Sequence, residues 1–265
     1  ARLEIFFHRP LGGTRWEALA KPAKRLKEGD VMILDGGWAA RVETKDPERG
    51  TLTLALPESP EAFFAYSEAH GEVPTPPYVA ADAATKAGYQ TVYAKEIGSV
   101  AAPTAGFHFT PELLERLEAR GIGRAFVTLH VGLGTFRPMK DGAIERHVMH
   151  QEWGHVPPAT VDAVKAAKAA GNRVISIGTT ATRALESAAQ AGELVPWSGD
   201  TGLFITPGYP FRVIDGLLTN FHLPKSTLIV LVSAFAGLEA TKNAYRHAIE
   251  EGYRFYSFGD AMLVS

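Results

Sequence analysis

A run of prolines divides this sequence into two parts with different patterning. Pro74, Pro76 and Pro77 fall within four positions of one another. Each proline fixes its own φ angle and restricts the residue before it, so the backbone here must be extended rather than helical. Short β-like segments precede the prolines, and alternating strands and helices follow them. We therefore predict a domain boundary here, between a domain over residues 1–72 and a second domain over residues 73–265.

The first part contains five short segments that suit β-strands. They begin at Leu3, Trp16, Val31, Ala40 and Thr51, and each is rich in apolar or β-branched residues. Turn-forming residues separate them, at Gly12-Gly13, Gly29-Asp30, Asp35-Gly36-Gly37 and Asp46-Pro47. Strands at such regular spacing are typical of a small barrel or sandwich, and we expect a β-barrel-like domain.

From Thr91 onward, expected strands alternate with expected helices. Thr110 suits the N-cap of a helix and Pro111 its first position. The apolar stretch over residues 125–131 is expected to be a buried strand. The remaining expected elements are a helix over 159–170, a strand over 173–177, a helix or strand over 226–236 and an amphipathic helix over 241–251. This alternation predicts an α/β domain.

Composition narrows the classes of function. The chain has 265 residues and no cysteine, which excludes disulfides, thiolate metal ligands and a cysteine nucleophile. Its formal net charge of −2 argues against a globally basic nucleic-acid coat. No segment reaches the roughly 18 consecutive apolar residues of a membrane span, and the first residues lack signal-peptide features. We expect a cytoplasmic protein without membrane association, in which proton transfer falls to His, Asp, Glu, Lys or Tyr.

A local positive run remains compatible with nucleic-acid binding. Lys21, Lys24, Arg25 and Lys27 lie within seven residues and could contact phosphates. The alternative is a solvated turn before Gly29.

One expected strand leads directly into a helix through a Gly-Thr-Thr sequence. Free N–H groups and the helix dipole at Gly178, Thr179 and Thr180 favour an anionic or polar ligand group, with Arg183 following on the same helix. Open α/β sheets bind ligands at such strand ends. The alternative role for either threonine is a plain N-cap.

A second glycine loop follows the strand expected over residues 125–131. Gly132 and Gly134 permit close backbone approach, Thr135 adds a hydroxyl, and Arg137 can bind a carboxylate or phosphate through two parallel hydrogen bonds. The loop lacks the dinucleotide-binding glycine spacing and the Walker lysine, which disfavours NAD binding and nucleotide hydrolysis. The alternative is a tight turn with a surface arginine.

Histidines concentrate in the middle of the chain, where they could transfer protons near neutral pH. Six of the nine are His108, His130, His147, His150, His155 and His222. The segment 147–155 also has donors at plausible metal spacing, but it shows no H-E-x-x-H pattern, and surface or packing roles are commoner. His130 lies in an apolar run, where a core histidine is the alternative.

A polar loop precedes the expected element over 226–236. Asn220, His222 and Lys225 lie close together there, with Ser226 as a candidate N-cap. A substrate-binding loop and an exposed capping segment both fit this pattern.

These segments, taken together, resemble the S-adenosylmethionine:tRNA ribosyltransferase-isomerase family of queuosine biosynthesis over nearly all of residues 89–265. The matching motifs lie at residues 89–93, 101–110, 128–138, 147–150, 178–186, 207–209, 217–227 and 258–262. The resemblance implies a mixed-sheet, three-layer α/β domain with a small β-barrel domain. Family members begin with a further N-terminal segment, so we expect this sequence to lack part of the barrel.

The resemblance also implies a reaction. The ribosyl part of S-adenosylmethionine is transferred to 7-aminomethyl-7-deazaguanine at the tRNA wobble position and isomerised, giving epoxyqueuosine-tRNA, adenine and methionine. No metal or redox cofactor is implied, because the sulfonium group activates its own substrate. The implied partners are therefore tRNA and S-adenosylmethionine, and we expect a monomer.

Physical requirements of this reaction suggest roles for the singled-out residues. A base must remove a proton beside the sulfonium and the departing adenine needs a proton or hydrogen-bond donor, for which the candidates are His108, His130 and His222. The candidate substrate-binding residues are Thr104, Gly106, Phe107, Thr110, Gly132, Gly134, Thr135, Arg137, Thr179, Thr180, Arg183, Asn220 and Lys225. The candidate tRNA-binding residues are Lys21, Lys24 and Arg25.

Two other readings remain open from the residues alone. The strand, Gly-Thr-Thr and helix unit also suits a nucleotide-handling or phosphoribosyl-handling α/β protein. The basic run also suits a non-enzymatic RNA-binding module.

Overall fold

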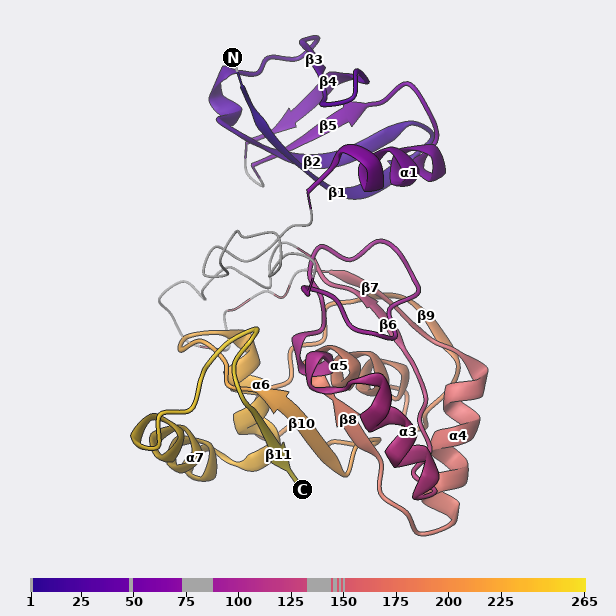
Figure 1. The fold of residues 1–265 in the computed structure, drawn as a ribbon, viewed down its shortest axis with the longest axis vertical. Coiled ribbons are helices and arrows are strands. Elements are labelled where there is room, and N and C mark those ends of the chain that lie inside the picture. Colours follow the sequence, from indigo (N-terminus) through magenta and orange to yellow (C-terminus); the bar gives the residue numbers. More distant parts are fainter. Residues whose placement is uncertain are drawn as a thin grey trace. The chain divides into compact units, whose positions relative to one another are not determined.

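The chain folds into two compact units, each described here by itself. The computed structural model describes residues 2–47, 50–72, 88–132, 144, 147, 149 and 151–265. One unit spans Ala1–Thr75 and the other spans Pro76–Ser265 (Figure 1).

The first unit contains a five-stranded antiparallel sheet. Its strands are β1 (Glu4–Gly12), β2 (Arg15–Lys21), β3 (Val31–Ile33), β4 (Ala39–Asp46) and β5 (Thr51–Ala55). Their order is β1-β2-β5-β4-β3, so the expected strands form one continuous sheet. Within the described residues β1 pairs only with β2 and β3 only with β4. The sheet therefore has two edges, and the expected closure into a barrel is not confirmed.

Alternating burial along the strands explains the core of this unit. Trp16 on β2 and Leu54 on β5 are buried at paired positions of neighbouring strands. Helix α1 (Pro60–His70), which the sequence patterning did not predict, adds Phe63 to this core, and its ring lies 4.8 Å from that of Trp16. The Ser59 hydroxyl accepts a hydrogen bond from the backbone of Ala62 and so caps the helix.

The second unit contains two three-stranded sheets. One has the order β11-β10-β8 and comprises β8 (Ile175–Ile177), β10 (Gly216–Asn220) and β11 (Ala261–Val264). In it β10 runs parallel to β8 and antiparallel to β11. The other has the order β6-β7-β9, is antiparallel, and comprises β6 (Thr128–His130), β7 (Glu152–Val156) and β9 (Trp197–Thr201). The expected mixed α/β class is confirmed.

Helix α5 (Gly178–Ala188) connects the two sheets of this unit. Nine of its eleven residues are buried, because it packs on β8 and β10 of one sheet and on β6, β7 and β9 of the other. Figure 1 shows α5 between these strands. Because α5 is buried, the positions of its first residues at the edge of the sheet are fixed.

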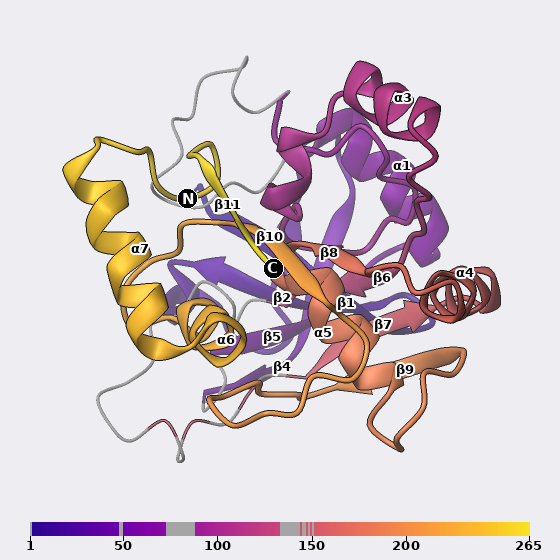
Figure 2. The same cartoon turned by 90° about the horizontal axis from the view of Figure 1, so that it is seen from below.

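The remaining helices are α3 (Pro111–Ala119), α4 (Pro158–Ala169), α6 (Thr227–Ala236) and α7 (Leu238–Glu250). Thr110 and Ser226 cap α3 and α6 through their hydroxyls, as the sequence predicts. Helices α6 and α7 lie side by side (Figure 2). Among the described residues no helix has the length and apolar character needed to cross a bilayer.

One strand is shorter than expected. The apolar stretch over 125–131 forms a strand only at Thr128–His130, because only these residues pair with β7. Phe126, expected to be buried, is 47% exposed.

Candidate active site

Three segments with predicted site residues meet at one edge of the mixed sheet. Strands β8 and β10 are parallel, so their carboxyl ends lie at the same edge, where β8 enters α5 at Gly178. The short helix η2 (Thr104–His108) packs against β10 and α5. We call this place the η2 edge: η2, Thr219 and Asn220 at the end of β10, and residues 178–180 at the start of α5.

Close packing fixes η2 at this edge. Gly178 has a φ of +88°, which favours glycine, and a Cβ added there would lie 3.4 Å from the Cβ of Ala105. Gly106 lies against Tyr93 and Thr91, so that an added Cβ would meet the Thr91 Cγ2 at 2.6 Å. Gly178 therefore lets η2 approach the start of α5, and Gly106 lets it approach Thr91 and Tyr93.

A hydrogen-bonded chain links η2 to β10. The Thr104 hydroxyl donates to Asn220 Oδ1 at 3.3 Å, and Asn220 Nδ2 lies 3.1 Å from His108 Nε2. Asn220 is 2% exposed, so its amide is held within the protein rather than solvated. Burial lowers the pKa of His108, an effect that Asp260 opposes and Arg254 reinforces. His108 is therefore held in its neutral form at neutral pH.

His222 is fixed by contacts from both sides. Its Nε2 lies 2.9 Å from Thr219 Oγ1, and its backbone N–H donates to the Tyr245 hydroxyl at 2.9 Å. Burial lowers the pKa of His222 to about 4 and raises that of Tyr245 to about 12. Phe221, between His222 and Asn220, packs its ring 5.3 Å from that of Tyr245.

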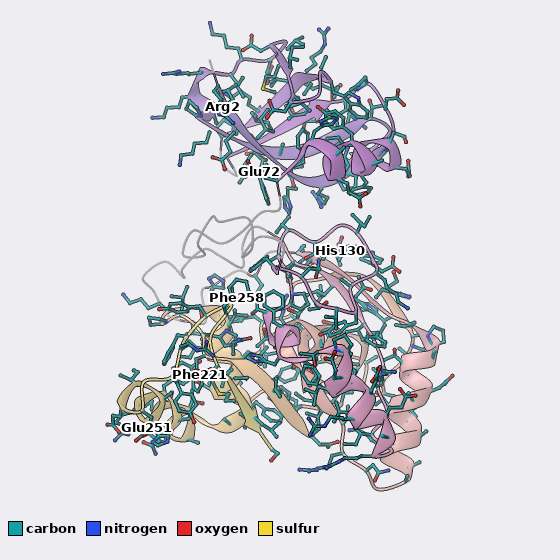
Figure 3. The ribbon with its side chains drawn as sticks, viewed as in Figure 1. Arg2, Glu72, His130, Phe221, Glu251 and Phe258 are labelled. Carbon is teal, nitrogen blue, oxygen red and sulfur yellow. The ribbon has the colours of Figure 1, made fainter. Side chains whose placement is uncertain are left out.

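His130 belongs to the other sheet of this unit. It lies on β6, where Figure 3 labels it, opposite Trp153 on β7. Its ring stacks on the Trp153 indole at a centroid distance of 5.0 Å. Burial lowers the pKa of His130, and Glu96 opposes the shift. Its Nδ1 is buried, and no described residue forms a hydrogen bond with it. Among the described residues no hydrogen bond joins His130 to His108 or His222.

A buried ion pair holds the start of the second glycine loop. Arg183 on α5 pairs with Glu152 on β7, and these residues are 7% and 4% exposed. Glu152 Oε1 also accepts the Gly132 N–H at 2.9 Å, and Arg183 Nε donates to the Leu203 carbonyl at 3.2 Å. The sequence singled out Arg183, whereas Glu152 was included only as one of the possible metal donors in the segment 147–155. Glu152 and Arg183 are 31 positions apart, so no local sequence pattern predicted that they would pair.

A small cavity adjoins this pair. It measures about 30 Å³ and is lined by Arg183, Glu152, Thr179 and Thr180 together with apolar side chains. No side chain caps the start of α5, and Arg183 Nη2 is buried with no hydrogen-bond partner in the described part of the chain. The cavity is therefore rich in donors, as the predicted polar-ligand role of the Gly-Thr-Thr segment requires.

Phe107 and Thr110 have packing and capping contacts. The Phe107 ring lies 5.4 Å from those of both Tyr89 and Phe258. Thr110 accepts a hydrogen bond from the Leu113 backbone as the N-cap of α3. Lys225 is exposed and has a φ of +57°. Roles of these residues in substrate binding stay predictions.

The candidate tRNA-binding residues belong to the other unit. Lys21, Lys24 and Arg25 are exposed at the end of β2 and on the short helix η1 (Ala23–Arg25). Lys45 supports this turn by donating to the carbonyls of Ala23 and Leu26. The ion pairs found within the described ranges involve none of the three. The predicted residues Gly134, Thr135 and Arg137 lie outside the described part.

Two further features lie apart from these contacts. Within the described ranges no group of three His, Asp or Glu side chains could hold a metal ion. A groove of about 640 Å³ between α6 and α7 is lined by Ile229, Leu238 and Ile249 among others, and none of the described predicted site residues lines it.

Comparisons with known proteins agree on one family. The model of a family described as queuosine biosynthesis protein matches residues 1–264. An S-adenosylmethionine:tRNA ribosyltransferase-isomerase of Rhodospirillum rubrum is 51% identical over 99% of this chain and 77% of its own length. That of Allorhizobium ampelinum is 53% identical over 97% of this chain and 74% of its own length.

A solved structure gives the same result. The crystal structure of an S-adenosylmethionine tRNA ribosyltransferase from Thermotoga maritima is 34% identical and covers all of this chain and 75% of its own, with a TM-score of 0.53. The resemblance predicted from the motifs is confirmed.

Proposed function

Because this chain belongs to the queuosine biosynthesis protein family, we propose that its η2 edge binds S-adenosylmethionine for ribosyl transfer to tRNA. The chain is an S-adenosylmethionine:tRNA ribosyltransferase-isomerase, a transferase of queuosine synthesis. The observation that supports the location is the hydrogen-bonded chain from Thr104 through Asn220 to His108, at the carboxyl ends of β8 and β10. Open α/β sheets place ligands at this edge.

The acceptor and products follow from the reaction of the family. The acceptor is 7-aminomethyl-7-deazaguanine at the tRNA wobble position, and the products are epoxyqueuosine-tRNA, adenine and methionine. A base removes the acidified proton beside the sulfonium, and a donor assists the departure of adenine. His108, His130 and His222 are the candidates for these two tasks.

Donor groups around α5 suit the polar end of the substrate. The uncapped start of α5 and the dipole of the helix favour the methionine carboxylate near Thr179 and Thr180. Arg183 balances Glu152 and keeps one guanidinium nitrogen for a further acceptor. Arg137 is the alternative carboxylate partner.

We assign binding of the tRNA backbone to the first unit. Lys21, Lys24 and Arg25 present exposed charges that can neutralise phosphates. The proposed reaction needs no metal or redox cofactor. The proposed protein is a cytoplasmic monomer, and its five-stranded sheet corresponds to the barrel-like domain.

Adenine release tests the proposed function. The protein is incubated with S-adenosylmethionine and tRNA carrying the 7-aminomethyl-7-deazaguanine base, and adenine is measured with and without the tRNA. We expect release only with this tRNA, and a loss of roughly tenfold or more in Asn220→Ala, which removes the central hydrogen-bonding group. The exposed Asn243→Ala on α7 is the matched control. Salt-sensitive tRNA binding without adenine release would instead indicate an RNA-binding module.

A further inference from the structure

The two nitrogens of the His108 ring have different surroundings. Nε2 lies 3.1 Å from Asn220 Nδ2, and an amide nitrogen can only donate a hydrogen bond. Nε2 must therefore supply a lone pair, which places the single proton of a neutral imidazole on Nδ1. None of the described residues forms a hydrogen bond with Nδ1.

Thr104 contacts the oxygen end of the Asn220 amide, and His108 contacts the nitrogen end. The Thr104 hydroxyl donates to Oδ1 at 3.3 Å, so the oxygen is directed to Thr104 and the nitrogen to the imidazole. The amide is buried, so each of its ends needs a protein partner. The other arrangement would reverse both hydrogen bonds at once.

The charged groups near His108 leave this arrangement intact. Asp260 favours a protonated ring and Arg254 disfavours it, and these two residues are paired with each other at 2.7 Å. Burial, the main cause of the lowered pKa of His108, also disfavours a protonated ring. The contact with Asn220, which only an unprotonated Nε2 can accept, then decides which ring nitrogen carries the single proton.

We propose that Asn220 is a positioning residue that holds His108 in its neutral Nδ1–H tautomer, so that His108 acts as a hydrogen-bond donor to S-adenosylmethionine and not as the proton-abstracting base. The assignment of the ligand rests on the proposed function of the η2 edge. The lone pair of Nε2 is already occupied by Asn220, and a donor can bind an uncharged acceptor such as a nitrogen of the adenine ring without any proton transfer. Proton abstraction then belongs to a different group.

Nitrogen NMR tests the tautomer without reference to activity. In ¹⁵N-labelled protein, long-range ¹H–¹⁵N correlations distinguish Nδ1–H from Nε2–H, and the His108 signals are assigned by their loss in His108→Asn. We expect Nδ1–H in the wild type at neutral pH. In Asn220→Asp, a carboxylate that can only accept should place a proton on Nε2. The control Asn243→Asp on α7 makes the same charge change at an exposed site.

Two results would overturn the tautomer assignment. One is an Nε2–H signal in the wild type, and the other is an Nε2 that stays unprotonated in a folded Asn220→Asp variant. If that variant does not fold, Thr104→Val provides the test, because it removes the hydrogen-bond partner of the amide oxygen. It should then give a mixture of tautomers, and an unchanged single tautomer would count against the role of Thr104.

Conservative substitution separates a donor from a base. The amide nitrogen of His108→Asn can stand where Nδ1 does but cannot take up a proton. We expect kcat/KM for adenine release to fall roughly 10- to 100-fold in His108→Ala and by less than about fivefold in His108→Asn. A base would lose roughly 100-fold or more in both variants, which would contradict the donor role. Absence of release by the wild type would count against the proposed function, and the NMR result would still decide the tautomer.

Discussion

Replacing His222 with glutamine should remove much of the acid sensitivity of the second unit. Burial lowers the pKa of His222 to about 4 from an ordinary value near 6.5. Its Nε2 lies 2.9 Å from Thr219 Oγ1, a hydrogen bond that a glutamine amide can replace. The substitution therefore removes the titrating group and keeps the local contact.

The direction in which stability changes with pH follows from proton uptake by the folded and unfolded states. With the lower pKa in the folded state, the unfolded chain binds a proton first as the pH falls. The stability due to neutral His222 is complete above about pH 6.5 and is lost between about pH 6.5 and 4. One pKa unit corresponds to about 1.36 kcal/mol, so the whole window is worth about 3 kcal/mol, of which about 2 kcal/mol is lost between pH 7.5 and 5.

Urea denaturation at these two pH values measures the effect. Amide hydrogen exchange of a peptide from β10 restricts the readout to the second unit. We expect the pH-dependent loss of unfolding free energy to be about 2 kcal/mol smaller in His222→Gln than in the wild type. The exposed His247 on α7 gives the matched control His247→Gln. Equal losses in wild type and His222→Gln would refute the reasoning.

Three further substitutions have expected outcomes. Glu152→Ala leaves the Arg183 guanidinium buried without its partner and should cost about 3–5 kcal/mol of unfolding free energy in urea denaturation. Gly106→Ala places a methyl group against the side chains packed on η2, so adenine release and the melting temperature should both fall. The double variant Lys24→Ala with Arg25→Ala should reduce the slope of log affinity for tRNA against log salt by about 2 in filter-binding titrations.

Each of these three predictions has a control variant. Glu118→Ala breaks the exposed pair with Arg124 and should cost less than about 1 kcal/mol. Gly123→Ala adds a methyl group where no atom lies within 4 Å and should leave the melting temperature unchanged. Lys165→Ala removes an exposed charge of the second unit and tests whether the salt slope depends on η1. Equal effects in a variant and its control would contradict the proposed cause.

Local signals predicted much of the fold. The hydroxyl of Thr110 and the proline after it marked the start of α3, and Ser226 marked the start of α6, because a helix start needs acceptors for its free N–H groups. Alternation of apolar residues marked the strands of the first unit. Helix α1 was not predicted, although Ser59 and Pro60 give it the same kind of start.

Other features depend on partners far away in the chain. The stretch over 125–131 has the apolar character of a buried strand, but only the residues that pair with β7 form one. Barrel closure in the first unit would require its edge strands to pair, which strand patterns alone do not decide.

The sequence by itself determined the family, the α/β class and the residue types that the reaction needs, because motifs and caps act over a few neighbouring positions. Only the tertiary structure decided which of these residues meet. Asn220 and His108 are 112 positions apart and come within 3.1 Å because β10 ends beside η2, and Glu152 reaches Arg183 because α5 is buried against both sheets. The tautomer of His108 depends on that meeting, since a proton is placed by the partner of the other ring nitrogen.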